Sequence, residues 1–323
     1  MKSIKHIIFI LTILVFISCE DYLEPEPTSV ISSVNFYSDE TQLMQGVFNM
    51  YDGLQGMNDT SSRSNHATQI EFYVTEMRSD NTRSKSGEGE AAQFDNFAVE
   101  ATNGLIADHY RSFYNVIFRA NTVLENIGVA SESNKAKIEG EAKFVRAYVY
   151  FNLVRLYGAL PLIDNVVSVG DDASYIRRSV EDVYELIVSD LNSAVAGLDN
   201  FNGKNRATKS AAQGLLAKVH LTLGNYLEAQ QLLESVMSEG FILEPNFSDV
   251  FFNESNSEVI FSIGYSSGLA LDSQNFSAEF LNGVGRTVGV NYVPDDAKAF
   301  MEANGGDRTV VFMRTDPIQP TQT

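Results

Sequence analysis

The sequence predicts a mainly α-helical protein with a smaller, irregular C-terminal segment that contains little β structure. Three observations lead to this fold class. Long stretches of the chain repeat apolar residues every three or four positions, which is the period of a helix with one buried face. Two such stretches, within residues 208–239, are joined by a short turn at Gly224. After about residue 250 this period stops, and Gly, Ser and Asn become frequent.

The first 18 residues have the pattern of a secretory signal peptide, and a lone cysteine follows them. Lys2 and Lys5 precede a mostly apolar run, Ile7–Ile17, and the small residue Ser18 comes next. The run is about 11 residues long, whereas a bilayer span takes roughly 20. Cys19 is the only cysteine of the chain, and at this junction its thiol is suited to carry the lipid of a bacterial lipoprotein. We expect lipidation at Cys19; the alternative is a plain secreted protein.

Composition excludes several classes of function. The chain carries a formal net charge of −19, and such an acidic surface repels phosphate backbones, so no nucleic-acid partner is expected. The same charge disfavours adsorption onto anionic lipid, so membrane contact should come from the acyl chains on Cys19. Hydrophobic residues make up 44% of the chain, enough for a substantial core. No second long apolar run predicts a transmembrane helix.

The first half of the mature chain is expected to be a tether followed by helices. Residues 19–34 are acidic, contain two prolines and form the tether. Helices are expected at 38–55, with Ser38 as N-cap, at 70–77, at 105–127 and at 132–157, with a polar, Gly-rich loop at 79–90. The buried stripe of helix 105–127 should consist of Ile106, Tyr110, Phe113, Ile117, Ala120, Leu124 and Ile127. In helix 132–157 the polar stripe should consist of Glu139, Lys143 and Arg146.

The second half is expected to hold three more helices and a little β structure. Ser179 and Asp182 form a capping box that opens a helix at 179–198. Two further helices, 208–223 and 225–239, make the hairpin that turns at Gly224. In residues 258–265, Val259, Phe261, Ile263 and Tyr265 alternate onto one face, so a strand is expected there. A last strand is expected at 309–314.

The hairpin at 208–245 has the spacing of a tetratricopeptide repeat. The pattern consists of Leu216, Ala217, Gly224, Tyr226, Ala229, Leu233 and Pro245. Ala217 and Ala229 are small because the two helices of such a unit cross closely there. One unit cannot bury its own faces, so several pairs must stack. The alternative is a helical hairpin of another kind.

Five stretches of the chain resemble the SusD/RagB family of nutrient-uptake lipoproteins of Bacteroidetes. They are CEDYL at 19–23, FRAN at 118–121, EAKFVRAYVYFNLVRLYGALPLI at 141–163, RATKSAAQGLLAKVHLTLGNYLEA at 206–229 and NFSDVFFNESNSEVIFSI at 246–263. They occur in the order of the family and span most of the mature chain. GDR at 306–308 resembles another landmark, beyond which members continue. The C-terminal portion of the family is therefore expected to be largely missing here.

This resemblance implies a surface-exposed lipoprotein of the cell outer membrane. Members cover a SusC-like TonB-dependent transporter as a lid, bind a glycan or another nutrient and hand it to the pore. The implied domains are a signal peptide at 1–18, the tether at 19–34, a SusD-like helical domain at 35–250 and the start of the RagB/SusD C-terminal region at 251–323. Two alternatives stay open: a tetratricopeptide-type scaffold that binds a protein, and a truncated lid without function.

We expect no enzymatic activity, no cofactor and no metal site. Residues 264–268 match G-x-S-x-G after an expected strand, but no helical pattern follows them, and no histidine follows Ser266. The usual order of a hydrolase triad is therefore impossible. His66, His109 and His220 show no metal-ligand spacing.

Sugar binding needs aromatic faces and planar polar side chains. The chain has no Trp, so Tyr and Phe must serve. The loop in which some family members place ligand contacts offers the candidates Asp80, Asn81, Arg83, Phe94, Asn96 and Phe97, and Tyr265 is a further candidate. Phe94 and Phe97 are three residues apart, and the alternative is that both belong to the core.

Overall fold

The computed structural model describes residues 36–56, 67–87, 89–168, 170–200, 203–253, 256–265, 280 and 291–312. The chain divides into two units, 1–38 and 39–323, and all elements described below belong to the second. The expected signal peptide, Cys19 and the tether lie outside the described residues. Within the described ranges, no helix has both the length and the apolar character needed to cross a membrane.

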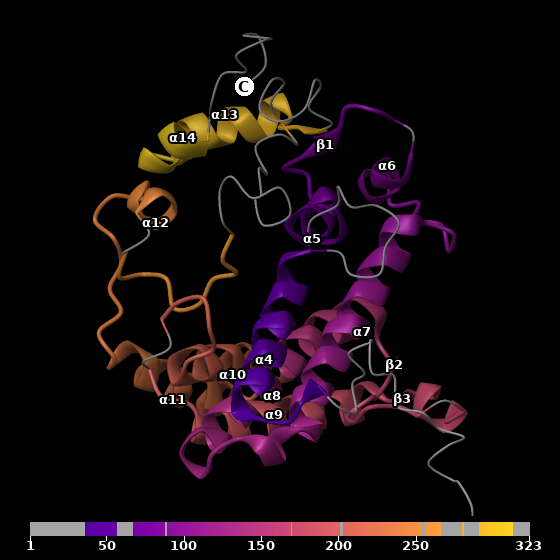
Figure 1. Ribbon diagram of the computed structural model, residues 1–323. Coiled ribbons are helices and arrows are strands. Elements are labelled where there is room, and N and C mark those ends of the chain that lie inside the picture. The colour runs from indigo at the N-terminus through magenta and orange to yellow at the C-terminus, as the bar shows by residue number, and fades with distance from the viewer. Residues whose placement is uncertain are drawn as a thin grey trace, which may run out of the picture. The chain divides into compact units, whose positions relative to one another are not determined.

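Helices dominate the second unit, as predicted (Figure 1). They are α4 (Glu40–Gln55), α5 (Ala67–Thr75), α6 (Glu90–Asp95), α7 (Gly104–Glu125), α8 (Glu132–Tyr157), α9 (Val180–Gly197), α10 (Lys209–Leu223), α11 (Tyr226–Met237), α12 (Asp249–Phe252), α13 (Asp295–Asn304) and α14 (Asp307–Phe312). Short 3₁₀ turns are η1 (Glu76–Arg78), η2 (Ile127–Val129) and η3 (Asp172–Tyr175).

The β structure in the described residues consists of two small antiparallel ladders. β1 (Arg83–Ser84) pairs with β4 (Asn291–Tyr292), which joins segments far apart in the sequence. β2 (Leu160–Pro161) pairs with β3 (Arg177–Arg178), with Pro161 opposite Arg177. The second ladder joins the two ends of the connection between α8 and α9.

Helix α8 lies at the centre of the helical packing. It contacts α9, α7, α4 and α10, and its residues are mostly buried from Ile138 to Val154, whereas its first turn and Arg155 are exposed. Its fully buried side chains include Val145, Ala147, Val149, Tyr150 and Leu153. A helix with neighbours on several sides is apolar over a wide arc, which is why α8 has no single apolar stripe. Its observed bounds agree with the prediction for 132–157.

Local capping explains where several helices begin and end. The predicted capping box of Ser179 and Asp182 is present at the start of α9. The side chain of Asp39, and not the predicted Ser38, caps α4 by accepting a hydrogen bond from the backbone of Gln42. Gly224 adopts a left-handed conformation with φ of 81°, which ends α10 and turns the chain into α11.

Two predicted stripes differ from the structure. On α7 the buried face consists of His109, Ser112, Phe113, Val116, Ile117, Ala120, Asn121 and Val123. It therefore shares only the middle of the predicted stripe, because α4, α5 and α8 pack on different parts of this helix. Arg146, predicted on a polar stripe of α8, is buried with 5% of its surface exposed. Its charge is compensated by Asp190, a partner on α9 that no local pattern indicates.

Both strand predictions in the C-terminal segment were wrong. Residues 258–265 form no ladder with any described residue; the backbone N–H of Ser262 donates one hydrogen bond to the carbonyl of Lys204, at 2.8 Å. Alternation alone does not make a strand when no neighbouring strand completes the hydrogen bonds. Residues 307–312, which overlap the second predicted strand, form helix α14. Helix α13 was not predicted.

Candidate functional site

A cleft of about 840 Å³ opens between α4, residues 204–205 and residues 250–265. Its aromatic lining consists of Phe48, Tyr51, Phe251, Phe261 and Tyr265. Its polar lining includes Gln55, Lys204, Asn205, Asn253 and Asn256. Aromatic faces beside planar amides and a cationic donor form the combination that recognition of a sugar requires.

Behind Tyr51 in the cleft lining lies an ion pair between the partly exposed Arg206 and the buried Glu141. The guanidinium of Arg206 donates to both carboxylate oxygens of Glu141, at 2.5 and 2.9 Å, and the Tyr51 hydroxyl donates to Oε2 at 2.9 Å. The same hydroxyl accepts a hydrogen bond from the backbone N–H of Ala207, at 2.8 Å. Burial, and then the charge of Glu141, raises the pKa of Tyr51 well above its ordinary value. The phenol therefore stays protonated and ties α4, α8 and residues 206–207 together.

The outer wall of the cleft is held by side-chain amides. The buried Asn256 donates to the carbonyls of Val250 and Asn253, at 3.2 and 2.8 Å, and its Oδ1 accepts from the backbone of Val259 at 3.0 Å. Gln55 at the end of α4 donates to the carbonyl of Gly264. The Tyr265 hydroxyl donates to the carbonyl of Gln55, at 3.2 Å. These bonds fix the shape of the wall and leave the aromatic faces as its contact surface.

Three groups of the cleft lining bear on ligand binding. The Lys204 ammonium is buried, and it has no hydrogen-bond partner in the part of the chain that the structure describes. A buried donor without an acceptor costs about 1–3 kcal/mol or more, so an incoming acceptor atom is strongly favoured. Phe48 and Phe251 are 54% and 56% exposed, which leaves their rings accessible from the cleft.

The predicted polar residues of the loop near residue 80 bind neighbouring side chains. Arg83 donates to Asp95 at 2.8 Å and to Asp80 at 3.2 Å. The side chain of Asn81 donates to Glu76 at 3.2 Å. These contacts shape the loop beside the β1–β4 ladder. The ligand role of these side chains stays a prediction.

The predicted aromatic pair of the same loop has two different environments. Phe94 is 2% exposed and packs in a cluster with Ile70, Phe72 and Met77. Phe94 is therefore a core residue, which was the alternative to a ligand role. Phe97 is 68% exposed and has a φ of 55°. Both residues line a smaller cavity of about 300 Å³. Asn96 is exposed and ends α6.

The structure therefore divides the predicted set. Phe94 and Phe97 share one cavity, whereas Tyr265 lines the larger cleft without any of the other candidates. Sequence reasoning missed Phe48, Lys204 and Phe251. They come from three separated segments, so no local motif could have found them.

The described ranges contain no cluster of His, Cys, Asp and Glu side chains that could hold a metal ion. His109 is fully buried, and its Nδ1 lies 3.0 Å from the hydroxyl of Tyr157. This histidine is part of the packed scaffold.

A family model described as "Starch-binding associating with outer membrane" matches residues 21–221. The chain belongs to the SusD-like family. A SusD-like protein of Bacteroides ovatus is 27% identical over 311 residues, which cover 88% of this chain and 55% of that protein. The chain thus spans about half the length of the curated SusD-like relatives it matches.

Solved SusD-like structures share the fold. One from Bacteroides fragilis is 28% identical with a TM-score of 0.62, and the match covers 72% of this chain and 46% of that one. A laminarin-binding SusD-like protein is 23% identical with a TM-score of 0.67, over 82% of this chain and 64% of that one; this likeness shows the fold alone. SusD-like proteins form a family of binding proteins rather than enzymes, which confirms the expectation from the sequence.

Proposed function

We propose that this SusD-like chain captures a glycan at the outer-membrane surface and delivers it to a SusC-like TonB-dependent transporter. The observation that carries the proposal is the cleft, where the exposed rings of Phe48 and Phe251 lie in one lining with the Lys204 ammonium, which has no hydrogen-bond partner among the described residues. The family description names starch binding and the outer membrane, and a protein of the same fold binds laminarin. The chain contributes reversible binding, and the energy for uptake comes from the transporter.

The chemistry of the cleft suits a pyranose. The apolar face of the sugar ring packs against Phe251 or Phe48, which are large and rigid contact surfaces. Sugar hydroxyl oxygens accept hydrogen bonds from Lys204, which removes the cost of its missing partner. The hydrogen-bonded wall around Asn256 keeps this arrangement in place before the ligand arrives, and a preformed site loses less entropy on binding.

The test is titration calorimetry of the mature chain with laminarin and starch oligosaccharides. F251A should weaken binding roughly tenfold, since loss of a stacking surface costs about 1.4 kcal/mol. F252A is the matched control, because Phe252 is 73% exposed and adjacent but does not line the cleft. The proposed site is refuted if both substitutions have the same effect.

The anchor and the partner are part of the same proposal. We place a signal peptide at 1–18, the lipid on Cys19 and a tether at 19–34. Capture of the tagged protein from mildly solubilised outer membranes should retain a stoichiometric TonB-dependent transporter, and C19S should shift the protein into the soluble fraction. Absence of the transporter from a folded, surface-exposed sample would argue against delivery.

A second candidate function is a scaffold that binds a protein. The observation favouring it is the exposure of large apolar side chains on α11: Tyr226, Leu227 and Met237 are 70%, 64% and 74% exposed. Such residues are typical of contact surfaces between proteins. Substitution of Met237 by lysine separates the two functions, because a scaffold loses its protein partner while glycan titration is unchanged.

A further inference from the structure

A second groove of about 760 Å³ lies along α7, opposite residues 161–177. Its aromatic lining consists of Tyr110, Tyr114, Phe118 and Tyr175. Phe118 and Tyr175 are 51% and 60% exposed, so their rings are accessible. The groove shares no lining residue with the cleft assigned to the glycan above.

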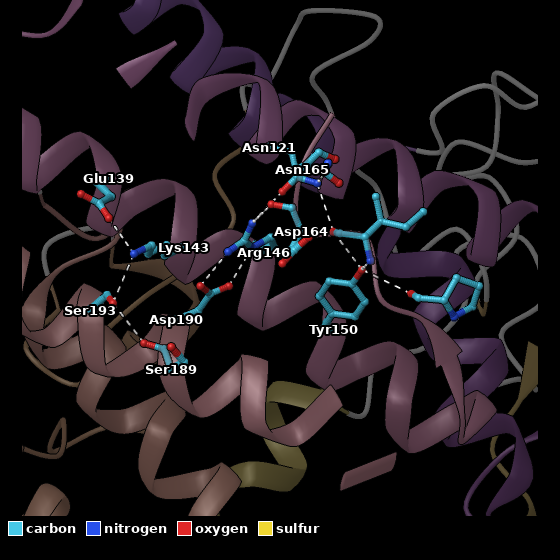
Figure 2. A network of polar contacts seen from close by, with 12 residues as sticks. Asn121, Glu139, Lys143, Arg146, Tyr150, Asp164, Asn165, Ser189, Asp190 and Ser193 are labelled. Atoms are coloured by element: carbon cyan, nitrogen blue, oxygen red, sulfur yellow. Dashed lines mark hydrogen bonds and ion pairs between the residues drawn. The ribbon is translucent and has the colours of Figure 1, made fainter. Parts of the chain in front are cut away.

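The wall of this groove is held from behind by a buried polar network. Figure 2 shows Arg146 of α8 between Asp190 of α9 and the side chain of Asn121. Arg146 binds Asp190 through two hydrogen bonds, at 2.7 and 2.8 Å, and donates to the backbone carbonyl of Asp164 at 2.8 Å. The amide of Asn121 donates to the backbone carbonyl of Asn165 at 2.9 Å. The backbone that forms the wall is therefore anchored to two long helices.

Two tyrosines complete this support. The Tyr114 hydroxyl donates to the carbonyl of Pro161 at 2.7 Å, and the Tyr150 hydroxyl accepts from the backbone N–H of Ile163 at 2.7 Å. The β2–β3 ladder then places Arg177 directly opposite Pro161. The groove is thus preformed, and a ligand would not have to order its wall.

The charge of the groove is opposite to that of the whole chain. The net charge is −19, yet the described lining holds Arg111 and Arg177 and no carboxylate. Arg111 lies 3.4 Å from Asp108, at the side of the groove. Arg177 is exposed and forms no ion pair with any described residue. A guanidinium group offers paired donors that match a carboxylate or a sulfate.

We propose that this groove is a second glycan site that selects an anionic sugar. The sugar ring stacks on Tyr175 and the neighbouring aromatic side chains, and its carboxylate or sulfate pairs with Arg177. This site differs from the neutral-glycan cleft, because other residues form it and it selects a negatively charged sugar. The chain would then recognise two chemically different parts of a glycan mixture.

The experiment titrates the mature protein with tri-galacturonate, which carries carboxylates, and with a sulfated neocarratetraose; maltotriose is the neutral probe. At least one charged probe should bind, and the two arms tell carboxylate from sulfate. R177Q should weaken that binding roughly tenfold, the effect of losing one charge-assisted contact. R178Q is the matched control on the same strand, since Arg178 does not line the groove, and should stay within about twofold.

Testing each variant with the ligand of the other site distinguishes binding in the cleft from binding in the groove. F251A should leave binding of the charged probe unchanged, and R177Q should leave laminarin binding unchanged. The inference is overturned if neither charged probe binds, if R177Q and R178Q act alike, or if F251A abolishes binding of the charged probe. Loss of laminarin binding alone affects only the proposed function of the cleft.

Discussion

The pair of Arg146 and Asp190 is the residue-scale feature on which the α8–α9 packing depends. Both side chains are nearly fully buried, with 6% and 3% exposed. Burial acts to lower the pKa of Arg146, but the hydrogen bonds and charge of Asp190 outweigh it and hold this pKa above its ordinary value. Burial raises the pKa of Asp190 in spite of the hydrogen bonds and charge of Arg146, and the Arg146 charge is compensated only while Asp190 carries its own.

We expect D190N to destabilise the protein by about 3–5 kcal/mol, because it leaves the Arg146 charge buried without its counter-charge. Urea unfolding measures the loss. The double variant R146M/D190L should recover part of it, since an apolar pair avoids the desolvation cost but leaves Asn121 and the carbonyl of Asp164 without the guanidinium donor. A loss below about 1 kcal/mol in D190N would place the pair with ordinary surface ion pairs and contradict this account.

Glu40 predicts a pH effect. Its carboxylate accepts hydrogen bonds from Ser131 and Asn134, which joins the start of α4 to the start of α8. These bonds lower the pKa of Glu40 below its ordinary value of 4.5. A carboxyl group with a lowered folded pKa stabilises the fold above 4.5, and this contribution is lost as the pH falls below it.

Thermal unfolding between pH 7 and pH 3.5 should show this contribution as a difference between the wild-type chain and E40Q. The difference should shrink as the pH falls. The loop residue Glu100 provides the control, since E100Q should change the melting temperature equally little throughout. A difference in melting temperature between wild type and E40Q that is independent of pH would exclude the titration of Glu40 as the source of the pH effect.

At the scale of elements, α8 and α9 approach closely at a glycine. A Cβ atom added to Gly197 would lie 2.3 Å from the backbone carbonyl oxygen of Ala136, closer than any real contact. We expect G197A to destabilise the protein by about 1–3 kcal/mol, because the helices must move apart. G214A is the matched control: a Cβ on Gly214 in α10 meets nothing within 4 Å, so Ala should be neutral or stabilising there. The measurement is the denaturant midpoint of each variant. Equal shifts of the midpoint in G197A and G214A would contradict the close approach of α8 and α9.

The elements differ in how far the sequence reveals them. Helices α8 and α9 were predicted within about a residue, because period, caps and a terminal glycine agree locally. Residues 258–265 were mistaken for a strand, since a strand depends on a partner that local alternation does not reveal. The burial of Arg146 also escaped prediction, because Asp190 lies 44 residues away.

The candidate site was less predictable than the helices. Tyr265 was identified as an aromatic residue suited to sugar, and it does line the cleft. Lys204 and Phe251 became candidates only once the fold brought their segments beside α4. Residues that meet only through tertiary structure have no characteristic spacing in the sequence. A single sequence therefore indicates which chemistry is available but not where the binding site lies.

At the scale of the whole molecule, the scaffold separates support from recognition. The partly buried pair of Arg206 with Glu141 and the buried pair of Arg146 with Asp190 both include a residue of α8; the first lies behind the cleft and the second behind the groove. The lining of the cleft and of the groove comes largely from loops and from positions on α4 and α7. Binding specificity can therefore change through the lining while the central helix and its two ion pairs stay constant.

The central position of α8 also has a consequence for the timescale of local opening. Because α4, α7, α9 and α10 all contact it, the middle of this helix cannot be exposed to solvent while its neighbours remain folded. Its amide protons, around Val149, should exchange with deuterium only through global unfolding. Exchange in α8 therefore measures the full free energy of unfolding. A ligand bound in the cleft or in the groove that raises this free energy would slow deuterium exchange in α8, although no residue of α8 lines either site.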